Sequence, residues 1–406
     1  MTATSSLNGL AVVELARVLA GPWAGQVLAD LGASVVKVES LNGDDTRRWG
    51  PPSIDNADGS RDAAYFHSTN RGKRSIAVDL SRPEGAAIVR QLAAGADVLI
   101  ENFKVGSLKK FGLDFDGLHR LNPRLVYCSI TGFGQSGPYA RRSGYDFVVQ
   151  GLGGIMDLTG DPAGEPQKTG VAFADLFTGL YSVIAIQAAL AHRDRTGAGQ
   201  WIDMALLDTQ VAVLANQGLN YLASGEPPRR LGNAHPNIVP YQVFPVADGA
   251  ITIAVGNSSQ FRGCVGALGL GELADDPRFS TNEQRVENRE ALVRQLSLAT
   301  VRFTRASLLA ALESAGVPAG PINTVEEVFA DPQVVHRGMR LDLPRPDGSR
   351  VPAVRTPILM SDTPLAYERS SPRVGEHTAE ILLELGYSPA DIARLGRDGV
   401  VGLAAD

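Results

Sequence analysis

The stretch that decides the fold runs from residue 11 to residue 39. It contains two short apolar segments, Ala11-Val-Val-Glu-Leu15 and Ser34-Val-Val-Lys-Val-Glu39, separated by an apolar stretch from Pro22 to Leu31. β-Branched residues favour strands, and proline suits the first turn of a helix. A strand, a helix and a second strand in this order predict a βαβ unit with parallel strands.

The same alternation continues along the N-terminal half. The further strands expected are Ser75–Asp79, Asp97–Ile100 and Leu125–Ser129, with helices at Pro83–Ala94 and Leu108–Leu113. Helical segments follow at 146–157 and 175–193, and then one long helix from Asp203 to Ala223. Strands and helices in alternation predict a parallel α/β sheet.

A second region begins after the linker Ser224-Gly-Glu-Pro-Pro-Arg-Arg230. Strands are expected at Tyr241–Val246 and Ala250–Val255, because Asp248-Gly249 between them is a hairpin signal. Helices at 258–268 and 287–315 follow, and a helix from Thr378 to Leu385 closes the chain. The predicted domains are residues 1–225 with the long helix, a small domain of residues 226–325, and residues 326–406 returning to the large domain.

Composition describes a globular protein without nucleic-acid or metal signatures. The 406 residues carry a net charge of −6 and no lysine- or arginine-rich block. The six histidines and two cysteines, Cys128 and Cys264, show no metal-ligand spacing, and isolated thiols fit a reducing cytoplasm. No apolar run reaches membrane-spanning length, and Met1-Thr-Ala-Thr-Ser-Ser6 lacks the pattern of a secretion signal. We therefore expect a cytoplasmic protein with no metal, membrane or nucleic-acid partner.

Gly132-Phe-Gly-Gln-Ser-Gly137 matches the glycine pattern of dinucleotide-binding loops and follows a predicted strand. That site also needs a helix opening at the third glycine. Pro138 and the pair Arg141-Arg142 follow instead. The loop more plausibly brings the backbone close to another ligand or to a neighbouring chain.

Asp175 is the strongest catalytic candidate in the chain. It lies in Gly170-Val-Ala-Phe-Ala-Asp-Leu-Phe-Thr-Gly179, among small and apolar residues just before a long apolar helix. An aspartate in this position is most often a helix N-cap. A desolvated carboxylate near a helix N-terminus can also act as a nucleophile. The window alone favours the cap.

The order and spacing of several motifs resemble the class III CoA-transferases, a group that includes formyl-CoA transferase, carnitine CoA-transferase and α-methylacyl-CoA racemase. The motifs are Leu19-Ala-Gly-Pro22, Val36-Lys-Val-Glu39, Asn70-Arg-Gly-Lys-Arg-Ser-Ile76, Asp97-Val-Leu-Ile-Glu-Asn-Phe103, Ser129-Ile-Thr-Gly-Phe-Gly-Gln-Ser-Gly-Pro138, Gly144-Tyr-Asp146, the Asp175 segment, Gly316-Val-Pro-Ala-Gly-Pro321 and Gly375-Glu-His-Thr378. The resemblance implies a large Rossmann-like domain, a smaller α+β domain and an interlocked homodimer. It also implies that Asp175 is the nucleophile and forms aspartyl anhydride and aspartyl-CoA thioester intermediates, with no tightly bound cofactor and with acyl-CoA as substrate.

Position 145 separates the branches of this family. The racemases have a histidine in the matching segment, whereas this chain has Tyr145. Because the pKa of tyrosine is near 10, it is a poor base for removing an α-proton at neutral pH. An α-methylacyl-CoA racemase therefore remains the alternative, and a non-catalytic CoA-binding protein is a second one.

The resemblance also implies contact residues and substrates. The CoA contacts would be Leu19, Ala20, Val78, Asp79, Asn102, Phe103, Lys104, Lys110 and Tyr145, with Lys110 beside a phosphate. Within the family, Gly43-Asp-Asp-Thr-Arg47, Trp49-Gly-Pro-Pro52, Ala234-His235 and Ile238-Val-Pro-Tyr-Gln242 resemble the succinyl-CoA:glutarate CoA-transferases. The acceptor would then be a dicarboxylic acid or an analogue, with candidate contacts Arg47, Arg71, Tyr145 and His235.

Two departures from formyl-CoA transferase affect these expectations. Ser40 replaces an arginine after the second strand, and the glycine-rich lid loop is missing. Protection of the intermediates must therefore come from another segment, for which the loop 232–241 is a candidate.

Overall fold

The computed structural model describes residues 4–404, so the first part of the N-terminal segment, where no secretion signal is expected, lies outside the described residues. The chain divides into two compact units. The first contains Met1–Gly153, Gly170–Val213 and Val335–Asp406, and the second contains Gly154–Thr169 and Leu214–Val334. The sequence predicted boundaries near residues 225 and 325 instead.

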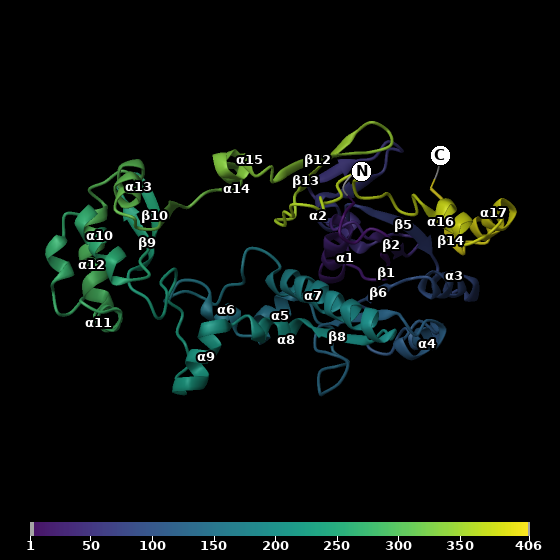
Figure 1. Ribbon diagram of the computed structural model, residues 1–406, viewed down its shortest axis with the longest axis horizontal. Helices are drawn as coiled ribbons and strands as arrows, with labels where there is room; N and C mark the ends of the chain where they lie inside the picture. Colours follow the sequence, from purple (N-terminus) through teal and green to yellow (C-terminus); the bar gives the residue numbers. More distant parts are fainter. Residues whose placement is uncertain (1–3, 405–406) are drawn as a thin grey trace. The chain divides into compact units, whose positions relative to one another are not determined.

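The first unit is built on a seven-stranded sheet with the order β14-β5-β2-β1-β6-β7-β8 (Figure 1). The strands are β1 (Ala11–Glu14), β2 (Ser34–Glu39), β5 (Lys73–Val78), β6 (Val98–Glu101), β7 (Val126–Thr131), β8 (Trp201–Ala205) and β14 (Val401–Gly402). Only β14 is antiparallel to its neighbour. Counted along the chain, the six parallel strands lie in the order 3-2-1-4-5-6, which is the Rossmann order.

Helices cover both faces of this sheet because successive strand residues point to opposite sides. Val12 and Val35 belong to a core with helices α1 (Ala20–Asp30) and α7 (Phe173–Thr196). Their neighbours Val13 and Val36 belong to a second core on the other face. The helices of that second core are α3 (Pro83–Ala94), α4 (Phe115–Leu121), α16 (Thr378–Glu384) and α17 (Pro389–Arg397).

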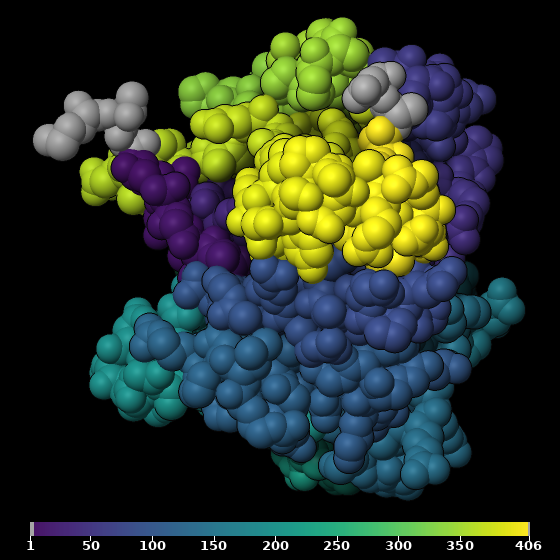
Figure 2. Space-filling view, turned by 90° about the vertical axis from the view of Figure 1, so that its right-hand side faces the viewer, coloured from purple at the N-terminus to yellow at the C-terminus, as the bar shows by residue number. Residues whose placement is uncertain are grey.

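The remaining elements of the first unit are short. They are the hairpins β3 (Ser53–Asp55)–β4 (Arg61–Ala63) and β12 (Arg340–Pro344)–β13 (Arg350–Val354), the helices α2 (Ala64–Asn70), α5 (Asp146–Leu152) and α8 (Leu206–Ala212), and the 3₁₀ turns η1 (Asp45–Arg48) and η2 (Lys109–Phe111). The space-filling view shows the C-terminal helices, in yellow, lying beside the blue residues of the N-terminal half (Figure 2). The ion pairs of Arg74 with Glu380 and Glu384, at 2.8 and 2.6 Å, join these distant segments.

Helix α7 is long and apolar enough to cross a membrane by length and composition alone. Core helices of globular proteins pass the same test. Val183, Ile186 and Leu190 of α7 are buried in the core on the sheet, which accounts for much of its apolar character. Gly179 allows the close packing of α7 on α1, since a Cβ atom there would lie 2.7 Å from the carbonyl oxygen of Ala20.

The second unit has a three-stranded antiparallel sheet with the order β11-β10-β9. Its strands are β9 (Tyr241–Val246), β10 (Gly249–Ala254) and β11 (Ala319–Pro321). Its helices include α6 (Ile155–Leu158), α9 (Ala215–Ser224), α10 (Ser258–Ala267), the 3₁₀ turn η3 (Gly271–Ala274), α11 (Asn282–Glu287), α12 (Arg289–Thr300), α13 (Arg305–Ser314) and α14 (Val325–Ala330). Helix α15 (Pro332–His336) lies at the boundary between the units. The core of the second unit includes Phe244, Phe261 and Leu296.

Most predicted elements are confirmed, but three are corrected. The predicted helix from Asp203 to Ala223 is wrong, because Trp201–Ala205 forms β8 and two shorter helices, α8 and α9, follow. Pairing with the buried strand β7 determines β8, and that partner is not visible in a local window. The predicted helix at 287–315 is two helices, and the one at Leu108–Leu113 is only a 3₁₀ turn.

Candidate active site

A cavity of about 400 Å³ lies at the carboxyl ends of β1, β6 and β7. Residues from the segments after these strands line it, among them Arg17, Asn102 and Gly132. Strand order reverses between β1 and β6, where the chain leaves one half of the sheet for the other. In open parallel sheets, ligands bind in the crevice at this position.

Asp175 lines the cavity from the first turn of α7. It is not the helix cap, because the N-cap position is Ala172 and no side chain of that residue caps the helix. Asp146 performs this role from α5: its Oδ1 accepts hydrogen bonds from the backbone N–H groups of Ala174 at 2.8 Å and Asp175 at 3.3 Å. The Asp175 side chain is therefore not needed for capping.

Burial, followed by the nearby charge of Asp146, raises the pKa of Asp175 to about 7. Both effects disfavour the charged carboxylate. A carboxylic acid with this pKa is partly ionised at neutral pH and is a stronger nucleophile when ionised than an ordinary aspartate. Perturbed acids in a cleft are typical of functional sites.

Four basic side chains line the same cavity, namely Arg17, Lys104, Arg141 and Arg142. Among the described lining residues, Asp175 is the only acid. The excess of positive charge suits a phosphorylated ligand, since Arg and Lys are the usual phosphate partners. Sequence reasoning did not assign Arg17, Arg141 or Arg142 to the site. The signals available were the position of Arg17 just after a strand and the arginine pair after the glycine-rich loop.

Of the residues expected at the site, seven lie together around the cavity. They are Leu19, Ala20, Asn102, Phe103, Lys104, Tyr145 and Asp175. Asn102 has a further role, because its Oδ1 accepts a hydrogen bond from the Arg17 N–H at 2.9 Å and its Nδ2 donates to the Arg17 carbonyl at 2.7 Å. Tyr145 is 61% exposed and lies at the N-cap position of α5.

Val78, Asp79 and Lys110 do not line the cavity. Val78 and Asp79 lie at the carboxyl end of β5, two strands away from β1, and Lys110 is exposed in η2. Their assignment to CoA stays a prediction, and it would require the bound molecule to extend beyond the cavity.

Arg47 and Arg71 also lie outside the cavity, and their positions do not support a role in binding the acceptor. Arg47 is buried, with its guanidinium group 2.7 Å from Glu39 and 3.0 Å from Asp62. Arg71 is buried against Asp30 at 2.5 Å. An arginine that is already paired inside the core would have to be uncovered before it could bind a substrate carboxylate.

His235 belongs to the second unit. Its Nδ1 accepts a hydrogen bond from the backbone N–H of Asn237 at 3.0 Å, and its ring lies 5.2 Å from that of Tyr241. These contacts order the segment 235–241. The roles expected for His235 and for the loop 232–241 stay predictions.

The glycine-rich loop 132–137 opens no helix, and the next helix begins at Asp146. Gly132 packs directly on Gly144, since a Cβ atom on Gly132 would lie 2.6 Å from the Cα atom of Gly144. Both glycines line the cavity, so their close contact forms part of its wall. Within residues 4–404, no group of three His, Cys, Asp or Glu side chains is arranged to hold a metal ion.

Comparison with known proteins agrees with this site. A family model described as CoA-transferase family III matches residues 7–378. A succinate–glutarate CoA-transferase of Agrobacterium fabrum is 61% identical over 93% of this chain and 95% of the relative. A succinyl-CoA:glutarate CoA-transferase of Homo sapiens is 42% identical over 97% of this chain and 90% of the relative.

Solved structures give the same result. The crystal structure of a CAIB/BAIF family protein from Brucella suis is 61% identical and has a TM-score of 0.84, covering 94% of this chain and 100% of that one. The chain therefore belongs to the family III CoA-transferases. It is an enzyme of the class that moves CoA between carboxylic acids.

Proposed function

We propose that this enzyme transfers CoA from succinyl-CoA to a dicarboxylic acid such as glutarate, with Asp175 as the nucleophile. The observation that carries the proposal is the partly buried Asp175 carboxyl group, the only acid among the described residues that line this basic cavity. The names of the two CoA-transferase relatives described above supply the substrate class.

In the proposed reaction, the Asp175 carboxylate attacks the thioester carbonyl of the donor. The bond from carbon to sulfur breaks, which gives an aspartyl–succinyl anhydride and the CoA thiolate. The thiolate then attacks the Asp175 carbonyl carbon and releases succinate, leaving an aspartyl-CoA thioester. The acceptor carboxylate then attacks the aspartyl-CoA thioester, which gives a new anhydride and the CoA thiolate. The thiolate attacks the acceptor carbonyl carbon of this anhydride, so that the acceptor leaves as its CoA thioester and the Asp175 carboxylate is regenerated.

This chemistry requires the exclusion of water, because the anhydride and the thioester both hydrolyse. Burial of Asp175 at the start of α7 supports such protection, as does its desolvated carboxyl group. The N-terminus of α7 also stabilises negative charge that develops nearby. The four basic side chains would bind the CoA phosphates, and Tyr145 would orient the acyl group.

The racemase alternative needs a base at the cavity that can remove an α-proton. None of the described lining residues is a histidine. Deuterium incorporation from solvent into an α-methylacyl-CoA would establish the racemase, and the absence of incorporation agrees with transfer. No observation favours a purely CoA-binding role over transfer, because Asp175, the nucleophile that transfer requires, lines the cavity.

Trapping of the intermediate tests the proposal. After incubation with succinyl-CoA, hydroxylamine should convert the activated Asp175 carboxyl group to a hydroxamate that mass spectrometry locates. Asp175→Asn should abolish both the label and turnover. Asp194→Asn, an exposed position on the same helix, is the matched control and should keep both. An absence of label on Asp175, with active wild-type enzyme, would refute the nucleophile.

We further propose that the enzyme is a cytoplasmic homodimer whose chains interlock, as the family resemblance implies. The support lies in exposed apolar side chains on α7, where Leu180 is 41%, Tyr181 42% and Ile184 62% exposed. Both cysteines are free and buried, which agrees with a reducing compartment. Sedimentation equilibrium should give twice the chain mass, and a monomer at micromolar concentration would refute the dimer.

A further inference from the structure

The loop between β1 and α1 carries an unusual backbone conformation. Val18 has a φ of 71°, and within residues 4–404 the only other non-glycine residue with positive φ is Ala215. A β-branched residue is a clear outlier in this region, because its Cβ atom crowds the backbone. Such a conformation persists only where surrounding contacts hold it.

Three side chains hold three consecutive residues of this loop. The Lys37 Nζ donates a hydrogen bond to the Ala16 carbonyl at 2.9 Å. The Asn102 amide binds both backbone groups of Arg17, as described above. The N–H of Val18 donates to the Asp44 carboxylate, at 3.2 Å from Oδ2.

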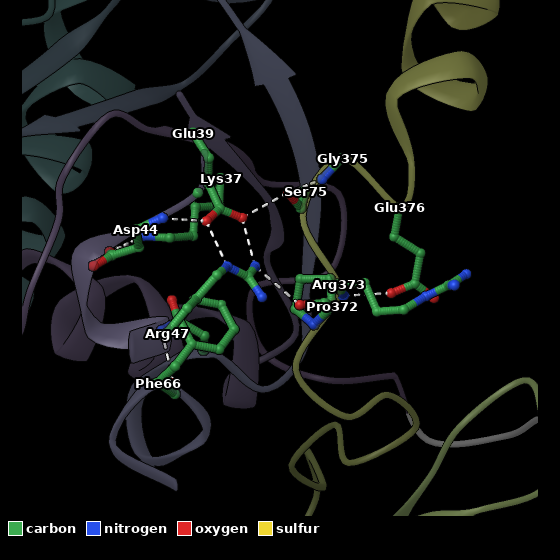
Figure 3. A network of polar contacts seen from close by, with 12 residues as sticks. Lys37, Glu39, Asp44, Arg47, Phe66, Ser75, Pro372, Arg373, Gly375 and Glu376 are labelled. Atoms are coloured by element: carbon green, nitrogen blue, oxygen red, sulfur yellow. Dashed lines mark hydrogen bonds and ion pairs between the residues drawn. The ribbon is translucent and has the colours of Figure 1, made fainter. Parts of the chain in front are cut away.

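Asp44 is itself fixed by a buried network of charges. Its Oδ2 lies 3.1 Å from Lys37 Nζ, and both side chains are fully buried. Its Oδ1 accepts hydrogen bonds from the Thr46 N–H at 3.0 Å and the Thr46 hydroxyl at 2.8 Å. Figure 3 shows the network passing from Asp44 through Glu39 to Arg47 and Ser75.

The charge state of Asp44 follows from these contacts. Burial alone would raise its pKa, but the Lys37 charge and the Thr46 hydrogen bonds lower the pKa overall. Asp44 is therefore an ionised acceptor for the Val18 N–H. A hydrogen bond to a charged group is stronger than one between neutral groups.

The other side of the loop faces the cavity. Residues Arg17 to Ala20 line it, and α1 begins at Ala20. The N-cap residue of α1, Leu19, makes no side-chain capping bond. The first turn of α1 therefore reaches the cavity directly after Val18 in the chain.

We propose that Asp44 is a positioning residue for CoA binding. It acts through the backbone of Val18, by holding this residue in a left-handed conformation that directs Arg17 and the start of α1 toward the cavity. The inference rests on the proposed function, in that CoA is taken as the ligand. Asp44 is not among the described residues that line the cavity.

Calorimetric titration with CoA tests this role apart from catalysis. Asp44→Asn keeps the size of the side chain but removes the charge, and it should raise the Kd for CoA about tenfold. The matched control is Asp30→Asn, which removes the same charge from the buried pair with Arg71, outside the cavity. The control should change the Kd less than about threefold.

Val18→Gly separates positioning from general stability. Glycine adopts positive φ without steric cost, so Asp44→Asn should weaken CoA binding less than about threefold in this background. If Asp44→Asn alone does not fold, the double variant carries the test. A folded double variant whose Kd for CoA lies within about threefold of that of Val18→Gly supports the positioning role. A double variant that does not fold overturns it.

The outcomes for the two proposals can be told apart. Wild-type protein that does not bind CoA would overturn both the proposed function and the positioning role. Wild-type protein that binds CoA, together with equal effects of Asp44→Asn and Asp30→Asn, would overturn the positioning role alone. The positioning role would also be overturned if Asp44→Asn raised the Kd for CoA by the same factor in the wild-type protein and in the Val18→Gly variant.

Discussion

Replacement of Asp146 by asparagine should lower the pH at which the enzyme becomes active. The Asp146 carboxylate accepts hydrogen bonds from the N–H groups of Ala174 and Asp175. An asparagine oxygen can accept the same bonds, so the helix start should keep its geometry. The negative charge, which helps to raise the pKa of Asp175 to about 7, is lost.

The size of the shift follows from the two causes. Burial is the larger cause and remains in the variant, so the pKa of Asp175 should stay above that of an ordinary aspartate. At an effective dielectric constant of about 20, two unit charges about 4 Å apart interact by about 4 kcal/mol, and a greater separation or exposure of the cavity to solvent reduces this value. We therefore expect the pKa of Asp175 to fall by about one unit, which is about 1.4 kcal/mol.

The assay is kcat/KM for succinyl-CoA as a function of pH, which reports the ionisation of the free enzyme. Wild-type kcat/KM should rise through pH 7, and the Asp146→Asn curve should rise about one unit lower. The plateau should fall in the variant, because a less basic carboxylate is a weaker nucleophile. Asp194→Asn provides the control. Identical midpoints for wild type and Asp146→Asn would refute the electrostatic role of Asp146.

Three further predictions follow from the structure. First, Asp175→Asn should increase the free energy of unfolding by about 2 kcal/mol at pH 8 but by little at pH 4. Between the ordinary pKa of an aspartate and about 7, the Asp175 carboxyl group keeps its proton in the folded protein but loses it in the unfolded chain, so the folded state is destabilised as the pH rises. A difference in urea titrations that does not change with pH would contradict this. Second, Arg47→Ala should lower the free energy of unfolding by about 3 kcal/mol, because it leaves two buried carboxylates without their arginine partner. The control Arg48→Ala, at an exposed position, should change the free energy of unfolding by less than about 1 kcal/mol. Equal urea midpoints for the wild type and Arg47→Ala would show that the buried ion pairs are dispensable. Third, Lys104→Ala should raise the KM for succinyl-CoA about tenfold and leave the KM for the acceptor acid nearly unchanged, if it binds a phosphate. In steady-state assays the exposed Arg397→Ala is its control, and equal effects on both substrates would argue against phosphate binding.

Local patterns were sufficient for much of the fold. β-Branched segments at 11–15 and 34–39 became β1 and β2, and Pro83 to Ala94 became α3 with the predicted bounds. These elements have strong local signals, and most residues of the two strands are buried. The strand β8 was missed because its stability comes from pairing with β7, 70 residues or more away in the sequence.

The candidate site also contains residues that the sequence could identify and residues that only the tertiary structure could judge. Asp175 could be selected from its segment and its family resemblance, as could Asn102, Lys104 and Tyr145, which the structure places around one cavity. Arg47 and Arg71 could not be judged from the sequence, because a basic residue in a loop looks the same whether it is exposed or paired inside the core. Only the acids that they contact, Glu39 and Asp30 among them, distinguish these cases.

The sequence by itself determined the alternation of strands and helices and the family resemblance, and it singled out Asp175 as the candidate nucleophile, since these depend on residue type and on spacing along the chain. The tertiary structure alone decided the strand order, the capping of α7 by Asp146 and the support of Val18 by Asp44. Each of these depends on groups from separate segments meeting within hydrogen-bond distance. Local secondary-structure propensity carries no information about contacts between distant segments, whereas burial and charge compensation in the folded chain determine these contacts.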